Sequence, residues 1–475
     1  MNTNEEDSSN VRRLEGRRMY GYSFGVLGQV LPTTLINAYI LMFYVYVVGL
    51  DPLLTSIGTS LGSLCNAFGA PIFGYLSDKK EPGRFGKRRP FLMVAIPILV
   101  ISLILIWMPP LTTPGESVNW GTAIYLWVSV IVFYTAYPTI RSSYLAMMAD
   151  HCNEEENLLQ ISSIQAIMSI LGTVVGIILP MILQGQLANP ENPYHTTADG
   201  QFLLRILPIL AAVIGIIALI VTIIVIVSID ESKMESCTEA PEKATLLDAI
   251  RSIVQPFTDK KYRKFLTSIL FSNSSIRMMT MVLAAFFTYV LLFQGNEFLF
   301  FTLLLLPFAI GGFVIWTKKG KTIGLKKSYI NSTLINGIAM ISLAVILLPL
   351  SLTAVRIIAF ILIGFGLSSL VASYILPNPI VSVIIDERQQ ALQVIEEEKN
   401  RDLPNAPEKK EKSLSGAYFG SLLFTFNIAN AFGDILIGVL LSGNERNPTI
   451  ITLILPLAAI LFFIAVLVVR NIDLD

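Results

Sequence analysis

Charged residues are scarce in this sequence: they make up 14% of its 475 residues, whereas 53% are hydrophobic and the mean hydropathy is +0.66. Soluble domains usually carry about 25% charged residues. The apolar residues are gathered into long runs such as 203–229 and 449–469, and about 20 apolar residues in a helix span a hydrocarbon core of about 30 Å. The composition therefore argues against a soluble core and predicts an all-α membrane protein with about twelve transmembrane helices.

An excess of charge of one sign is also missing, because 34 Lys and Arg balance 34 Asp and Glu. No nucleic-acid partner is therefore expected. The sequence has only three cysteines, and none is predicted to lie on an oxidising side, so no disulfide is expected. It has no HExxH zinc motif and no Walker phosphate loop. We therefore expect neither an enzyme nor a pump driven directly by ATP, with no cofactor and no bound metal.

The apolar runs and the segments between them define the predicted organisation. A central charged segment, 230–263, separates two six-helix halves, 20–229 and 264–470, and the second half contains a long polar segment, 386–415. An N-terminal segment, 1–19, and a C-terminal tail, 471–475, flank the helices. The predicted helices span residues 20–48, 53–77, 90–112, 120–148, 158–187, 203–229, 264–293, 296–317, 328–350, 353–385, 416–442 and 448–470.

The cationic residues predict the orientation of the chain. Most of the 34 Lys and Arg fall in the N-terminal segment and in loops on the same side of the predicted membrane. Because short cytoplasmic loops carry an excess of Lys and Arg, both termini are expected in the cytoplasm. The expected location is the plasma membrane, with the lipid bilayer as an obligatory partner.

A basic motif follows the second predicted helix: GYLSD at 74–78, then RFGKRRP at 84–90. This segment resembles the loop signature of the major facilitator superfamily. Its ending resembles that of the glycoside–pentoside–hexuronide:cation symporter family, which includes melibiose permeases and relatives of sucrose transporters. Segments 43–50, 144–150 and 286–290 resemble the same family. The resemblance implies the major facilitator fold and a carrier, expected to be a monomer, that moves a sugar, glycoside or sugar acid by alternating access.

The resemblance also assigns gating residues within the basic motif. Asp78, at the cytoplasmic end of the second helix, is expected to pair with nearby arginines, for which Arg84, Arg88 and Arg89 are the candidates. Such contacts would hold the two halves together in the outward-facing state and break when the carrier switches. The alternative is that these arginines only determine the topology.

The sequence departs from the family at the cation site. Cation-coupled members carry two aspartates one turn apart in the second helix, and the alignment places Asn66 and Ala70 there. The family's acids in the first helix fall at Val30 and Tyr46, and its arginine in the fifth helix falls at Gln165. Because these carboxylates are missing, we expect transport to be independent of sodium and coupled, if at all, to protons.

Three ionisable residues lie within the predicted hydrocarbon layer: Arg141, Arg277 and Asp434. Each costs at least about 2.5–3.5 kcal/mol on insertion scales, so each is a functional candidate. The family fold places both arginines on helices that line the cavity, where they would bind a carboxylate or phosphate. Asp434 is either a proton carrier for coupling or a countercharge. A structural Arg141 that pairs with Asp150 is the alternative to substrate binding.

Neutral polar and aromatic side chains complete the expected substrate site, because amides bond sugar hydroxyls and aromatic rings stack on sugar faces. Hydrogen bonding between helices explains any one of these residues equally well. The alternative functions are a carrier of another organic anion or lipid-like solute, and a non-transporting membrane receptor with the same fold. The neutral candidates are Tyr22, Gln29, Asn37, Tyr44, Asn66, Tyr144, Gln165, Asn273, Asn427 and Asn430.

Overall fold

The computed structural model describes residues 13–80, 83–112, 119–152, 154–184, 194–229, 246–400 and 414–472. These residues form helices and short connections, with no strand among them and one isolated bridge between Gly83 and Gly86. In this part of the chain, eleven helices are long and apolar enough to cross a membrane. The prediction of an all-α membrane fold is confirmed.

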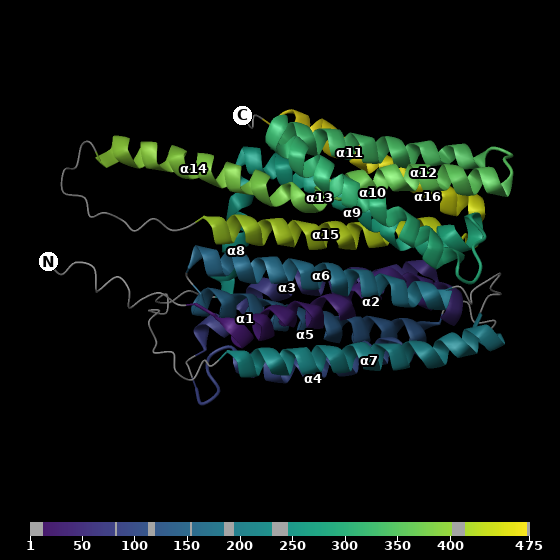
Figure 1. The fold of residues 1–475 in the computed structure, drawn as a ribbon, viewed down its shortest axis with the longest axis horizontal. Coiled ribbons are helices and arrows are strands. Elements are labelled where there is room, and N and C mark those ends of the chain that lie inside the picture. The colour runs from purple at the N-terminus through teal and green to yellow at the C-terminus, as the bar shows by residue number, and fades with distance from the viewer. Residues whose placement is uncertain are drawn as a thin grey trace. The chain divides into compact units, whose positions relative to one another are not determined.

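Contacts between residues divide the chain into two compact units (Figure 1). Unit 1 comprises residues 1–246, 292–299 and 437–445, and unit 2 comprises 247–291, 300–436 and 446–475. The helices of unit 1 are α1 (Gly16–Ser23), η2 (Phe24–Val26), α2 (Leu27–Met42), η3 (Phe43–Val48), α3 (Pro52–Lys79), α4 (Arg89–Ile106), α5 (Trp120–His151), α6 (Glu155–Gln184), η4 (Tyr194–Thr196) and α7 (Ala198–Ser228).

The helices from residue 246 onward belong mainly to unit 2, and the ends of α8, α10 and α15 extend into residues of unit 1. They are α8 (Leu246–Val254), η6 (Gln255–Thr258), α9 (Lys260–Ala285), η7 (Phe286–Val290), α10 (Glu297–Thr322), α11 (Leu325–Ser342), η8 (Leu343–Leu347), α12 (Leu352–Leu370), α13 (Ala372–Ile375), α14 (Pro377–Asn400), α15 (Ser415–Leu441) and α16 (Pro448–Arg470).

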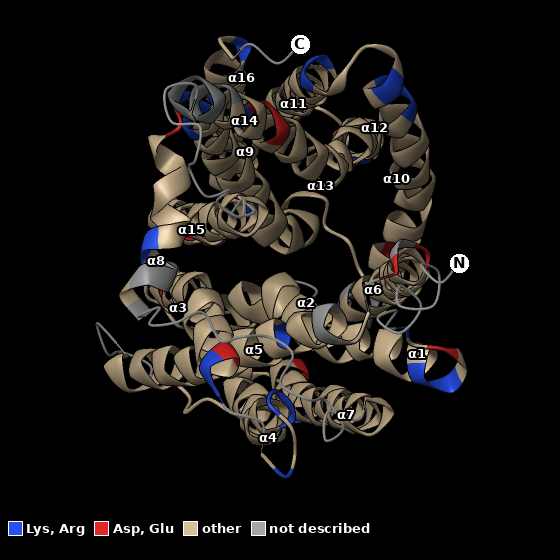
Figure 2. Ribbon diagram, turned by 90° about the vertical axis from the view of Figure 1, so that its left-hand side faces the viewer, with Lys and Arg blue, Asp and Glu red and all other residues tan. Residues whose placement is uncertain are grey.

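The helices pack side by side within each unit (Figure 1). In unit 1, α5 packs on α3 and α4, and α2 packs on α6 and α7. In unit 2, α16 packs on α9 and α11, and α11 also packs on α12. Figure 2 looks along the helices and shows that Lys, Arg, Asp and Glu occupy few positions on the ribbons, as the composition predicts.

The long helix α3 is not among the eleven apolar spans. Its 28 residues include small polar side chains that are buried, Thr55, Ser56 and Thr59 among them. Small residues let α3 lie close to α5: a Cβ at Gly62 would stand 2.5 Å from Val130. These small residues serve the packing of α3 against its neighbour. Because several of them are polar, they also lower the mean hydropathy of α3. With α3 counted, the described residues contain the predicted twelve long helices.

The tenth predicted helix is longer than the sequence pattern indicated. The prediction ended it at residue 385, whereas α12, α13 and α14 continue to Asn400. Residues 386–400 are rich in Glu and Gln, which have high helix propensity. The polar segment predicted at 386–415 is therefore helical over its first half, since polarity ended the apolar run without ending the helix.

Candidate functional site

An ion pair joins α9 and α15 within unit 2. Arg277 Nε donates to Asp434 Oδ1 at 2.5 Å, and Arg277 Nη2 donates to Asp434 Oδ2 at 3.3 Å. The Asp434 side chain is fully buried and Arg277 is 8% exposed. Two parallel bonds between a guanidinium and a carboxylate form a strong, geometrically specific contact. The charges of Arg277 and Asp434 therefore neutralise each other, and a role in proton coupling stays a prediction.

Gly433 allows the two helices to approach at this ion pair. A Cβ at position 433 would stand 2.8 Å from the carbonyl oxygen of Ser274 and 2.9 Å from Arg277 Cβ. The hydroxyl of Ser274 donates to the carbonyl oxygen of Ala429 at 2.9 Å, so the same stretch of the interface also has a polar contact. The absence of a side chain at 433 thus places the Asp434 carboxylate within reach of Arg277.

Two predicted amides lie one turn before the charged pair. Asn273 precedes Arg277 by four residues on α9, and Asn430 precedes Asp434 by four residues on α15. Side chains four residues apart lie on the same face of a helix. Asn273 and Asn430 are both half-buried, so the faces that carry the ion pair continue as polar faces for one further turn.

Arg141 has a different environment, on α5 in unit 1. Its side chain is exposed, and Nη1 donates to the hydroxyl of Tyr137 at 2.9 Å. Tyr137 is neutral, and among the residues that the structure describes Arg141 forms no ion pair. A guanidinium that faced lipid tails would be costly, which favours contact between this face of α5 and water. The side chain of Asp150, the alternative partner, lies outside the described residues.

Tyr22, Tyr144 and Gln165 come together and tie α1, α5 and α6 to one another. The Tyr22 hydroxyl donates to the Tyr144 carbonyl at 2.6 Å, and the Tyr144 hydroxyl donates to the Tyr22 carbonyl at 2.8 Å. Their rings stack with centroids 4.5 Å apart, and Gln165 Nε2 donates to the Tyr144 hydroxyl at 2.8 Å. These polar atoms bond between helices, which is the packing alternative for polar residues in membranes. Direct contact with substrate stays a prediction for all three.

The remaining neutral candidates lie on α2, η3, α3 and α15. Tyr134 donates to Asn37 Oδ1 at 3.2 Å, the Tyr44 hydroxyl donates to the Ile106 carbonyl at 2.7 Å, and Asn427 Nδ2 donates to the Leu423 carbonyl at 2.9 Å. Gln29 on α2 is 6% exposed and Asn66 on α3 is half-buried. Their roles in binding also stay predictions.

The basic motif folds onto the end of α3. Arg88 Nη2 lies 2.9 Å from Asp78 Oδ1, and Arg88 Nη1 donates to the Ser77 hydroxyl at 3.1 Å. Arg89 donates to the carbonyl oxygen of Ile229 at the end of α7. Arg84 is exposed and lies over the ring of Phe85. The structure thus contains an Asp78–arginine pair of the expected kind, and its use as a gate stays a prediction.

Tyr137 is a site residue that the sequence interpretation missed. It precedes Arg141 by four residues, a spacing that brings two side chains of one helix together, so the sequence contained the signal. Among the described residues, no group of three or more His, Cys, Asp or Glu could hold a metal ion.

A family model described as MFS/sugar transport protein matches residues 21–390. The chain is 24% identical over 268 residues to the sodium-dependent lysophosphatidylcholine symporter 1 of Gallus gallus, which covers 52% of this chain and 49% of that protein. It is 26% identical over 198 residues to the isoprimeverose transporter of Lactiplantibacillus pentosus, which covers 41% of this chain and 39% of that protein. The chain thus matches about half or less of the length of these curated relatives.

Solved structures share the fold at low sequence identity. The nucleoside transporter NupG superposes with a TM-score of 0.61 at 12% identity, over 96% of this chain and 99% of that chain. A D-xylose-proton symporter superposes with a TM-score of 0.59 at 16% identity, over 94% of this chain and 97% of that chain. At these identities, the likeness concerns the fold alone.

Proposed function

Because the chain belongs to the MFS/sugar transport protein family, we propose that it carries a sugar, glycoside or sugar acid across a membrane by alternating access. The apolar helices and the family match make it an integral, multi-pass membrane protein. Its relatives include proteins named as symporters, and the transporter neighbours share its fold. The substrate and the coupling ion belong to the proposal.

The observation that supports this substrate class is the environment of Arg141, which forms no ion pair within the described part of the chain. Arg277 is neutralised by Asp434, whereas Arg141 is exposed and bonded to the neutral Tyr137 hydroxyl. A guanidinium grips carboxylates and phosphates through two parallel bonds. We therefore assign Arg141 to the acidic group of the substrate and expect a sugar acid to bind more tightly than the matching neutral sugar.

The proposed coupling ion is a proton. Asn66 and Ala70 occupy the positions where the family resemblance places cation-binding aspartates, and neither offers a carboxylate. Asp434 is a buried acid of unit 2, and protonation would release Arg277 from its bidentate contact. A proton on Asp434 would thus change the contact between α9 and α15, which is the kind of two-state element that coupling requires.

A second candidate substrate is a lysophospholipid. Several relatives carry the name sodium-dependent lysophosphatidylcholine symporter 1, and the protein of Danio rerio named as form 1-B is 23% identical over 392 residues. A phosphate on a lipid-like solute would suit Arg141 as well as a uronate carboxylate does.

A ligand screen on the purified protein distinguishes these candidates. The melting temperature is measured with glucuronate, glucose and lysophosphatidylcholine, because a ligand that binds the folded state raises it. The proposal expects a rise with glucuronate that exceeds the rise with glucose. A rise with lysophosphatidylcholine alone would replace the sugar acid with the second candidate.

A further inference from the structure

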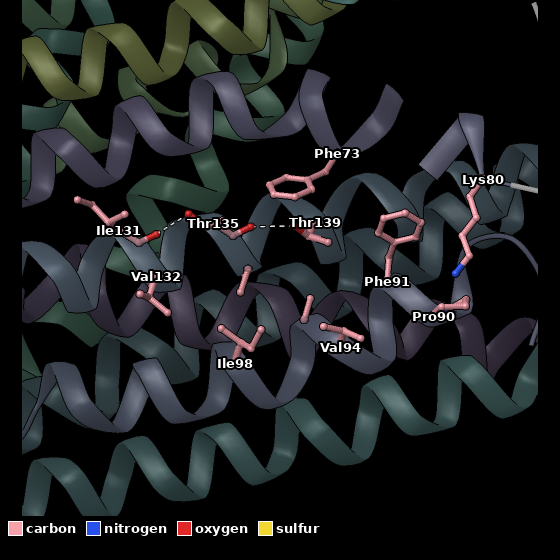
Figure 3. Close-up of a pocket in the computed structure, with 12 residues that line it drawn as sticks. Phe73, Lys80, Pro90, Phe91, Val94, Ile98, Ile131, Val132, Thr135 and Thr139 are labelled. Carbon is pink, nitrogen blue, oxygen red and sulfur yellow. Dashed lines mark hydrogen bonds between the residues drawn. The ribbon is translucent and has the colours of Figure 1, made fainter. Parts of the chain in front are cut away.

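We propose that a groove on unit 1 binds one acyl chain of an anionic phospholipid, with the lipid phosphate held at Lys80. The groove has a volume of about 480 Å³ and lies between α3, α4 and α5 (Figure 3). Ligand pockets usually have volumes of about 300–1,000 Å³, so the groove is large enough for a ligand. The proposal concerns a lipid bound beside the helices and does not depend on the identity of the transported substrate.

The lining of the groove is almost wholly apolar. Phe73 comes from α3, Phe91 and Ile98 come from α4, and Ile131 comes from α5. Two threonines of α5 also line it, but their hydroxyls are engaged: Thr135 donates to the Ile131 carbonyl at 2.7 Å and Thr139 donates to the Thr135 carbonyl at 2.8 Å. Both hydroxyls donate within the helix, so the groove suits a hydrocarbon chain and offers no free hydroxyl donor from these threonines.

The groove is open at the surface of the helices. Val94 is 65% exposed, Ile98 is 42% exposed and Val132 is 38% exposed. In a protein that spans a membrane, exposed aliphatic side chains within apolar helices contact lipid tails. An acyl chain can therefore enter the groove sideways from the bilayer, without passing through water.

Lys80 supplies a cation at one end of the groove (Figure 3). It is the residue that caps α3, so it lies where the apolar helix ends. Its ammonium lies 5.4 Å from the centre of the Phe91 ring, which also lines the groove. Lysines near helix ends extend toward the headgroup region, where they attract anionic lipids. The combination of an apolar groove and a single terminal cation matches a phospholipid: a hydrocarbon chain with a phosphate at one end.

Two substitutions test the two parts of the proposal, and each has a matched control. Lys80→Gln removes the cation, while Lys79→Gln removes its neighbour, which lies against Tyr75 instead of in the groove. Ile98→Trp fills the groove, while Ile101→Trp adds the same bulk on α4 at an exposed position that does not line it. Lys80 is half-buried and the other three substituted residues are exposed, so the folded core stays intact.

The experiment titrates dioleoyl phosphatidylglycerol into the detergent-purified protein and counts bound lipid by native mass spectrometry. We expect one retained lipid, about fivefold weaker binding in Lys80→Gln, loss of that lipid in Ile98→Trp, and unchanged binding in both controls. Inorganic phosphate should not compete, since it lacks the chain. Binding that is equal in the wild type, Lys80→Gln and Ile98→Trp would overturn the proposal, as would equal losses in the test variants and their controls.

Discussion

Arg277 and Asp434 are 157 positions apart in the sequence and form a buried bidentate ion pair between α9 and α15. Removing one partner from a buried ion pair leaves a charge without a counterion, which costs about 3–5 kcal/mol, whereas removing both partners costs much less. The pair therefore makes unit 2 sensitive to any change that affects only one of the two charges.

We expect Asp434→Asn and Arg277→Gln each to destabilise the protein by about 3–5 kcal/mol. The double variant should lose less than either single variant, because no charge is then left buried alone. Thermal unfolding of the purified variants measures this coupling. Losses that simply add in the double variant would show that the two side chains do not depend on each other.

Gly433→Ala tests the close approach of α9 and α15. The new methyl group would stand 2.8 Å from the Ser274 carbonyl oxygen, and overpacking of this kind costs about 1–3 kcal/mol. Gly416→Ala is the matched control on the same helix, because nothing lies within 4 Å of a Cβ there. We expect a lower melting temperature for the 433 variant and an unchanged or slightly higher one for the 416 variant. Equal melting temperatures would contradict the packing described at the ion pair.

Arg141→Gln tests the assignment of the acidic group. A hydrogen bond to a charged group contributes about 1.5–3 kcal/mol, so glucuronate binding should weaken about tenfold to a hundredfold while glucose binding changes little. Tyr137→Phe removes only the neutral hydroxyl that accepts from Arg141, and its effect should be smaller. Isothermal titration of the purified variants gives both affinities. If both ligands weaken equally in Arg141→Gln, the charge of Arg141 does not select the substrate.

The buried environment of the Cys152 thiol leads us to expect that its labelling rate depends on pH. It follows α5, outside the apolar span, and burial raises the pKa of its thiol above the ordinary value of 9.0. Its Sγ donates to Asn157 Oδ1 at 2.9 Å, and Asn157 also bonds both backbone polar groups of Leu14 at 2.9 Å. A raised pKa leaves less thiolate at any given pH. In a variant whose other cysteines are Ser, maleimide labelling should therefore stay slow at about pH 7–8 and accelerate only above about pH 9.

Asn157→Ala supplies the comparison for this labelling experiment. It removes the acceptor of the thiol and both contacts to Leu14, so Cys152 becomes more accessible and should react faster at about pH 8. Rapid labelling of the chain with Asn157 intact, at a rate equal to that of the SDS-unfolded protein, would contradict the buried position of Cys152.

The fold could be predicted from the sequence because a backbone that crosses hydrocarbon must satisfy its own polar groups, and apolar runs of about 20 residues do so as helices. The weak points of the prediction have physical causes. The small polar residues of α3 hide its membrane character from a hydropathy measure, and the charged residues after 385 ended the apolar run although α14 continues to Asn400. Hydropathy predicts which part of a helix lies in the membrane. It does not predict the residue at which the helix ends.

The sequence predicted individual candidate residues of the site but not which of them contact one another. Arg277 and Asp434 stood out because charge is costly in a membrane, but no local pattern links positions 157 residues apart. Tyr22 and Tyr144 were predicted to bind substrate, which stays a prediction, and the sequence did not indicate that their hydroxyls and carbonyls bond each other. A sequence gives no means to separate a polar side chain that faces a cavity from one that joins two helices, because both occur at the same spacing on an apolar helix.

Solute counterflow in proteoliposomes tests the central claim most directly. Vesicles that contain the purified protein are loaded with unlabelled glucuronate and diluted into trace labelled glucuronate without ATP. An alternating-access carrier exchanges the two, so the label should accumulate transiently, saturably and equally in sodium and choline buffers. Labelled glucuronate that binds the protein and never enters loaded vesicles would contradict the account and identify a receptor with a transporter fold.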